Sequence, residues 1–175
     1  MFSDLIKPRF LVITGMIILA ALVRFIPHPP NFAPIAALAL FGGKYYNDKK
    51  LAFVIPILVM IITDAVIGFH YLIPMVYFSF LLIVGIGLLL RKTNKVSWLI
   101  AGSLAASTLF FVLTNFFEWY IGILYPHTFS GLITCYVAAI PFFFNSIVAD
   151  LFFFIAMSMT FEFLVNRYPV LAKAK

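Results

Sequence analysis

The sequence predicts an all-α, polytopic membrane protein with six transmembrane helices, and three observations support that prediction. First, 65% of the 175 residues are hydrophobic and only 10% are charged, and the mean hydropathy is +1.13. A soluble domain carries about 25% charged residues. Second, short polar turns divide the chain into successive apolar runs. Third, nearly all of the basic residues fall in alternate connections between these runs, which is typical of a membrane protein.

The first three helices follow from the lengths of the apolar runs, because a bilayer core requires about 20 helical residues. We expect the first helix over 10–26, where a cluster of prolines ends it. The second, over 32–46, is short and rich in small residues. A half-helix surrounded by protein is an alternative to a full span there. The third helix covers 51–69 and contains a proline and an aspartate.

The last three helices are expected over 71–90, 97–124 and 132–165. The fifth is long enough to tilt or to project from the bilayer. The sixth is too long for one simple crossing, so we expect Pro141 to kink it or to separate a short outer piece from the span. The six helices are predicted to form a single transmembrane domain.

The positions of the basic residues predict the topology. With the N-terminus inside, one basic residue, Arg24, falls outside. The inner loops and tails then hold the other eleven of the twelve: Lys7, Arg9, Lys44, Lys49, Lys50, Arg91, Lys92, Lys95, Arg167, Lys173 and Lys175. A re-entrant second run would spoil this pattern, so we predict six full spans. The positive-inside rule then places both termini in the cytoplasm, in a multi-pass protein of the cell inner membrane.

A polar cluster in the outer half of the helices is the candidate ligand-binding site. Asp64 and Glu118 lie about 8 to 9 Å below the outer helix ends at 1.5 Å per residue, and Asn115 lies about one turn deeper. An ionisable residue inside a membrane usually faces the bundle interior and marks a functional site. Two interpretations remain open. The cluster lines an outward cavity, or Arg24 pairs with one of the carboxylates and only holds the helices together.

Further candidates come from the sixth helix and the outer loops. Asn145 and Asp150 are the polar residues of the sixth helix best placed to line the interior. Trp119 follows Glu118, so its ring either stacks on a bound ring or belongs to the interfacial belt. The predicted ligand-binding residues are therefore Arg24, His28, Asn31, Asp64, Asn115, Glu118, Trp119, His127, Asn145 and Asp150.

No motif in the chain predicts catalysis or metal binding. The phosphate-binding Gly-Lys-Ser/Thr loop, Gly-x-Ser-x-Gly and His-Glu-x-x-His are all missing. The three histidines come from separate loops and have no close-spaced partner, which predicts no metal site. We therefore expect a protein that is not an enzyme, and the sequence identifies no cofactor. The net charge of +6 lies in short loops, so it predicts no nucleic-acid partner.

Several strings resemble a family of small bacterial six-helix membrane proteins. They are His28-Pro29-Pro30-Asn31-Phe32-Ala33-Pro34, Phe41-Gly42-Gly43, Thr63-Asp64, Gly68-Phe69-His70, Thr114-Asn115-Phe116, Tyr125-Pro126-His127-Thr128 and Ile140-Pro141-Phe142-Phe143. That family is similar to the substrate-binding (S) components of energy-coupling factor (ECF) transporters. S components capture a vitamin outside the cell and dock on a transmembrane coupling protein with two ATPases.

The resemblance implies a substrate-binding or transport subunit that takes a small, vitamin-like metabolite from the extracytoplasmic side. S components dock through small residues on their first helix, where this chain offers only Gly15, Ala20 and Ala21. The expected partners are the lipid bilayer, a small-molecule ligand, and either such a coupling module or another membrane complex. The alternative function is a structural or assembly subunit, for which Gly102 and Ala106 provide a helix-packing face.

Overall fold

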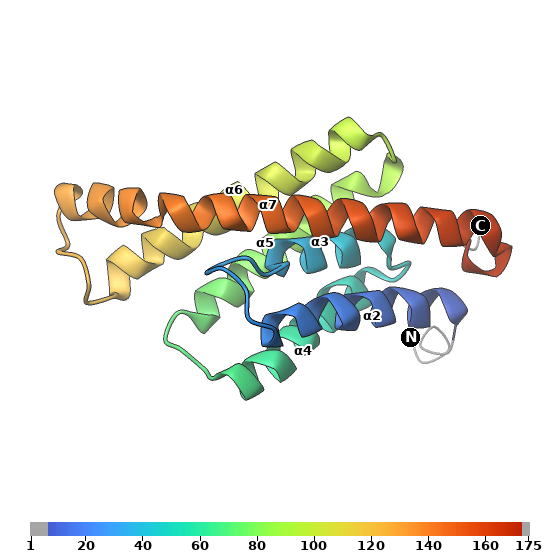
Figure 1. Ribbon diagram of the computed structural model, residues 1–175, viewed down its shortest axis with the longest axis horizontal. Helices are drawn as coiled ribbons and strands as arrows, with labels where there is room; N and C mark the ends of the chain where they lie inside the picture. Colours follow the sequence, from blue (N-terminus) through green and yellow to red (C-terminus); the bar gives the residue numbers. More distant parts are fainter. Residues whose placement is uncertain (1–6, 173–175) are drawn as a thin grey trace.

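The computed structural model describes residues 7–172, and this part of the chain is helical with no strand (Figure 1). Its elements are α2 (Pro8–Ala21), η1 (Leu22–Phe25), α3 (Ile35–Tyr45), α4 (Lys49–Ile67), α5 (Ile73–Leu89), η2 (Leu90–Lys92), α6 (Val96–Ile121), α7 (Phe129–Arg167) and η3 (Pro169–Leu171). The predicted all-α fold with six helices is confirmed. Within the described residues, 5 of these helices are long and apolar enough to cross a membrane, and α3 is the shorter apolar helix.

Helix α3 lies inside the bundle, between α2 and α7 in Figure 1. It also contacts α4, α5 and α6, and every residue from Ala36 to Tyr45 is buried. With 11 residues it is about 16 Å long, roughly half the thickness of a bilayer core. It begins after Pro34, later than the predicted residue 32, because the chain before a proline is disfavoured from helical geometry.

Glycines let α3 approach α5 closely. A Cβ atom added to Gly43 would lie 2.3 Å from the carbonyl oxygen of Val84, and one added to Gly87 would lie 2.5 Å from the carbonyl oxygen of Leu40. Side chains at either position would therefore separate the two backbones. This is the small-residue packing by which membrane helices associate without a hydrophobic driving force between them.

Two arginines from outside α3 bind its C-terminal end, where the Lys44 side chain of α3 itself also lies. Arg91 donates from Nε to the carbonyl oxygen of Gly43 over 2.8 Å, and Arg9 donates to that of Tyr45 over 2.9 Å. Lys44 donates to the carbonyl oxygen of Leu90 over 3.1 Å. The last carbonyl groups of a helix have no intrahelical partner, and cations at this end complement the helix dipole. We call this region the basic end of the bundle.

The hairpin of α6 and α7 projects beyond the other helices at the opposite end (Figure 1). Helix α7 has 39 residues, a length of about 58 Å, and it continues through Pro141, so no outer piece is separated. Its start is fixed by Thr128, whose side-chain oxygen accepts a hydrogen bond from the amide of Gly131 over 3.1 Å. We call this region the cavity end, and it holds the loops 26–34, 68–72 and 122–128.

Candidate ligand-binding cavity

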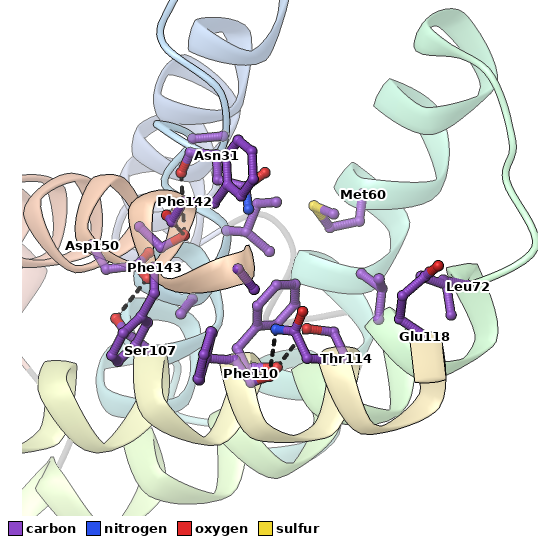
Figure 2. Close-up of a pocket in the computed structure, with 18 of the residues that line it drawn as sticks. Asn31, Met60, Leu72, Ser107, Phe110, Thr114, Glu118, Phe142, Phe143 and Asp150 are labelled. Carbon is purple, nitrogen blue, oxygen red and sulfur yellow. Dashed lines mark hydrogen bonds between the residues drawn. The ribbon is translucent and has the colours of Figure 1, made fainter. Parts of the chain in front are cut away.

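A cavity of about 310 Å³ lies among α3, α4, α5, α6 and α7 at the cavity end of the bundle. Residues from the loops 26–34 and 68–72 border it. Six of the ten predicted ligand-binding residues line it: Arg24, Asn31, Asp64, Asn115, Glu118 and Asp150. Figure 2 shows Asp150 and Ser107 on one side of the cavity and Glu118 and Leu72 on the other.

Arg24 and Asp64 form an ion pair at the wall of the cavity. The Arg24 Nη2 atom lies 2.5 Å from Asp64 Oδ1, and Nη1 donates to Thr63 Oγ1. The second carboxylate oxygen of Asp64 accepts a hydrogen bond from the Tyr77 hydroxyl over 2.8 Å. The side chains of the pair are only 11% and 6% exposed. These two residues therefore form an ion pair that balances both charges, and both also line the cavity.

Asp150 on α7 is buried at the N-terminal end of α3. Its Oδ1 accepts from the backbone amide of Ala37 over 3.0 Å, and its Oδ2 accepts from the Ser107 hydroxyl over 2.8 Å. The first amide groups of a helix lack intrahelical partners, and a carboxylate there is stabilised by the helix dipole. Asp150 thus caps α3 and joins it to α6 and α7, with both of its oxygens in use.

Glu118 on α6 differs from the other two carboxylates. Its Oε2 accepts a hydrogen bond from the Tyr71 hydroxyl over 2.5 Å, which raises the pKa of Tyr71 to about 12. Its Oε1 is buried and receives no hydrogen bond from the part of the chain that the structure describes. Within residues 7–172, the ion pair that forms is Arg24 with Asp64, and no cationic side chain pairs with Glu118.

The polar residues one turn from Glu118 are bound to their own helix. Thr114 donates to the carbonyl oxygen of Phe110 over 2.7 Å, and Asn115 donates to that of Phe111 over 2.8 Å. These bonds satisfy the hydroxyl donor of Thr114 and one of the two amide donors of Asn115 in an apolar helix. They leave the side-chain oxygens of both residues as acceptors at the cavity wall.

Aromatic rings form much of the remaining wall. Phe110, Phe111, Phe142 and Phe143 all line the cavity, and the rings of Phe111 and Phe143 stack with their centroids 4.3 Å apart. Sequence reasoning missed these rings because the chain has 22 Phe residues, and spacing alone singles out none of them. It also left out His70, which lines the cavity from the loop 68–72.

Two predicted residues, His28 and Asn145, contact the loop 26–34 and do not line the cavity. The exposed His28 ring contacts the carbonyl of Pro29, and Asn145 donates to the carbonyl oxygen of Pro30 over 2.9 Å. The loop turns at Asn31, which has a φ of 61°, a conformation that asparagine tolerates better than most residues. Asn145 therefore holds the turn that places Asn31 at the cavity.

The other two predicted residues, Trp119 and His127, also lie outside the cavity lining. The indole of Trp119 donates to the carbonyl oxygen of Pro126 over 3.0 Å, and its ring packs edge-on against His127 with the centroids 6.0 Å apart. Both side chains thus pack onto the turn between α6 and α7.

The comparisons with known proteins give one family. The sequence model of DUF6580, described as a family of unknown function, matches residues 4–171. Comparison with curated proteins gives no match, and neither does comparison with solved structures. The predicted likeness to S components therefore gains no support beyond the apolar helical bundle.

Proposed function

The chain belongs to the DUF6580 family, and from that premise we propose that it is an integral membrane protein that captures a small metabolite in the cavity among α3 to α7. The observation that supports this proposal is the cavity itself. Its volume of about 310 Å³ is that of a small-molecule site. Its wall combines four phenylalanine rings with polar side chains that can orient a ligand.

The proposed direction of capture follows from the distribution of charge. Arg9, Lys44 and Arg91 gather at the basic end of the bundle, and the cavity lies at the other end. Under the positive-inside rule the basic end faces the cytoplasm. The cavity then opens toward the extracytoplasmic side of the inner membrane, and both termini are cytoplasmic.

The proposed role is binding and transport and not catalysis. Two of the three cavity carboxylates are already bound, Asp64 by Arg24 and Asp150 by the start of α3. Asp64 and Asp150 are therefore suited to keeping the cavity walls in place before a ligand binds. A coupling protein with ATPase subunits, as the resemblance to S components implies, stays a prediction about the partner.

An assembly subunit of a larger membrane complex is the second candidate function. The observation that favours it is the apolar tip of the projecting hairpin, where Ile123 is 97% exposed and Phe129 is 76% exposed. A patch of this kind marks contact with a protein or with lipid. A stoichiometric protein partner in native mass spectrometry, with no small molecule bound, would support this candidate.

The test fills the cavity without changing the outer surface of α7. Ala139 lines the cavity, and its neighbour Ala138 is exposed, so Ala139→Trp and Ala138→Trp form a matched pair. We expect a co-purified small molecule, detected by native mass spectrometry, in the parent protein and in Ala138→Trp, and its loss in Ala139→Trp. Equal occupancy in both variants would sink the proposal, and so would an empty parent protein.

A further inference from the structure

The unmatched carboxylate of Glu118 points to the chemical class of the ligand. We propose that the cavity takes a small organic cation, and that the positively charged nitrogen of this ligand pairs with Glu118. This inference rests on the proposed function, because it assigns a charge to the ligand of the same cavity.

The first step in the argument is the charge of the cavity wall. Its acidic residues are Asp64, Glu118 and Asp150, and its one arginine or lysine is Arg24. The charge of Arg24 is paired with Asp64, and both carboxylate oxygens of Asp64 have partners. Asp150 is held by a helix start and by Ser107. What remains without a counter-charge is Glu118.

The second step is the geometry of Glu118. One oxygen is held by Tyr71 over 2.5 Å, so the carboxylate is oriented before any ligand arrives. The other oxygen is buried and receives no bond from the described residues. A buried acceptor that lacks a donor is costly, and a donor supplied by a ligand removes that cost. A positively charged donor gives the stronger, charge-assisted hydrogen bond.

The third step is the rest of the wall. The faces of aromatic rings attract cations, and four phenylalanines line this cavity. The side-chain oxygens of Thr114 and Asn115 add acceptors one turn from Glu118. An inorganic cation needs several oxygens close together at short range, and the described residues contain no group of three His, Cys, Asp or Glu side chains that could hold a metal ion.

The alternative for an anionic ligand fails on the same contacts. Arg24 is the one arginine or lysine of the cavity wall that could pair with a carboxylate or phosphate, but its guanidinium is bound to Asp64 and to Thr63. The amide groups at the start of α3, another anion site in principle, are occupied by the carboxylate of Asp150. An anionic ligand would also face the unbalanced charge of Glu118.

Three probes of similar size and different charge test the inference on the purified full chain in potassium chloride. They are phenethylamine, phenethyl alcohol and phenylacetate. We expect phenethylamine to bind at least about tenfold more tightly than the alcohol, and phenylacetate not to bind, by calorimetry and by the rise in Tm. Glu118→Gln should abolish this preference, because it keeps the acceptor for Tyr71 and removes only the charge.

Tyr71→Phe separates binding from a purely structural role of Glu118. If Glu118 serves only to hold Tyr71, Glu118→Gln and Tyr71→Phe should change binding of the amine in the same way. If the Glu118 carboxylate binds the ligand, Tyr71→Phe should retain the preference for the cation. Equal binding of amine and alcohol, a preference that survives in Glu118→Gln, or equal stabilisation by sodium ions overturns the inference. If the alcohol binds as tightly as the amine and Ala139→Trp abolishes the binding of both, the cavity is a ligand site without a preference for cations. That result overturns the inference and leaves the proposed function standing. No binding by any probe, with no co-purified molecule, overturns both proposals.

Discussion

The two ends of α3 are both bound by charged side chains from outside that helix, and both border a cavity, of about 310 Å³ at the N-terminal end and about 230 Å³ at the C-terminal end. At the basic end, Arg9 and Arg91 donate to the last carbonyl groups, and Lys44 of α3 itself donates to the carbonyl oxygen of Leu90 in η2. At the cavity end, Asp150 accepts from the first turn. The charges at both of these positions stabilise the helix itself. What distinguishes the cavity end is Glu118, a carboxylate that no part of α3 uses.

The comparison shows that a buried charge is not by itself evidence of a site. Two cations, Arg9 and Arg91, and one anion, Asp150, are explained by the unsatisfied peptide groups of one short helix. A membrane offers no water to those groups, so their partners must come from the protein. At the cavity end, the informative group is Glu118, which lines the cavity and has one buried oxygen without a partner among the described residues.

Removing the cap at the N-terminal end of α3 should give the largest loss of stability. Asp150→Ala leaves the amide of Ala37 and the hydroxyl of Ser107 buried without a partner, and we expect a cost of about 3 kcal/mol in unfolding free energy. Asp48→Ala is the matched control, because Asp48 caps α4 from a partly exposed position. It should cost about 1 kcal/mol. Equal losses by thermal unfolding in detergent would remove the distinction between the buried cap and the exposed one.

Adding a methyl group on α5, where it packs closely against α3, should give the next largest loss of stability. A methyl group at Gly87 would meet the carbonyl oxygen of Leu40 at 2.5 Å, so Gly87→Ala should cost about 2 kcal/mol. Gly85 on the same helix has no atom within 4 Å of an added Cβ, so Gly85→Ala serves as the control and should change stability little. The Tm values of Gly87→Ala and Gly85→Ala, compared with that of the parent protein, test this prediction. The larger Ala139→Trp change should be tolerated better than Gly87→Ala, and the reverse order would mean that the cavity end is as tightly packed as the contact with α5.

The smallest effect concerns the protonation of Tyr71 at the mouth of the cavity. Its hydrogen bond to Glu118 raises its pKa to about 12, so its phenol stays neutral in the folded protein where a free tyrosine, at about 10, would ionise. The stabilising effect of the bond is complete below about pH 10 and is lost as the pH rises toward about 12. The tyrosinate absorbance that Tyr71→Phe removes should appear near pH 12, and nearer pH 10 in Glu118→Ala, which lacks the acceptor for the Tyr71 hydroxyl. The same midpoint in both backgrounds would contradict the bond.

Hydropathy and charge placement predicted the six helices because these patterns repeat over whole segments of the chain. The ends of the second helix were less predictable. Its start depends on the turn at Asn31, which Asn145 on a distant helix holds in place. Its end depends on Arg9 and Arg91, whose bonds to backbone carbonyls carry no signal in the sequence.

The polar part of the cavity was predictable, and the aromatic part was not. Glu118, Asn115 and Asp64 stand out because a polar residue in an apolar helix is rare. The cavity phenylalanines look like every other phenylalanine in the chain. The pairing of charges could not be predicted either, since the structure is needed to show that Arg24 pairs with Asp64 and leaves Glu118 without a counter-charge.

The position of α3 has a consequence for biogenesis. Asp150 lies 113 residues after Ala37, the amide that it caps. The ribosome therefore releases this short helix long before it makes the residue that stabilises its first turn. Until α7 enters the membrane, α3 is too short to span the bilayer alone and carries bare peptide groups at one end. A segment made late, α7, thus stabilises a helix made early, α3. A chain that ends before α7 should therefore be degraded.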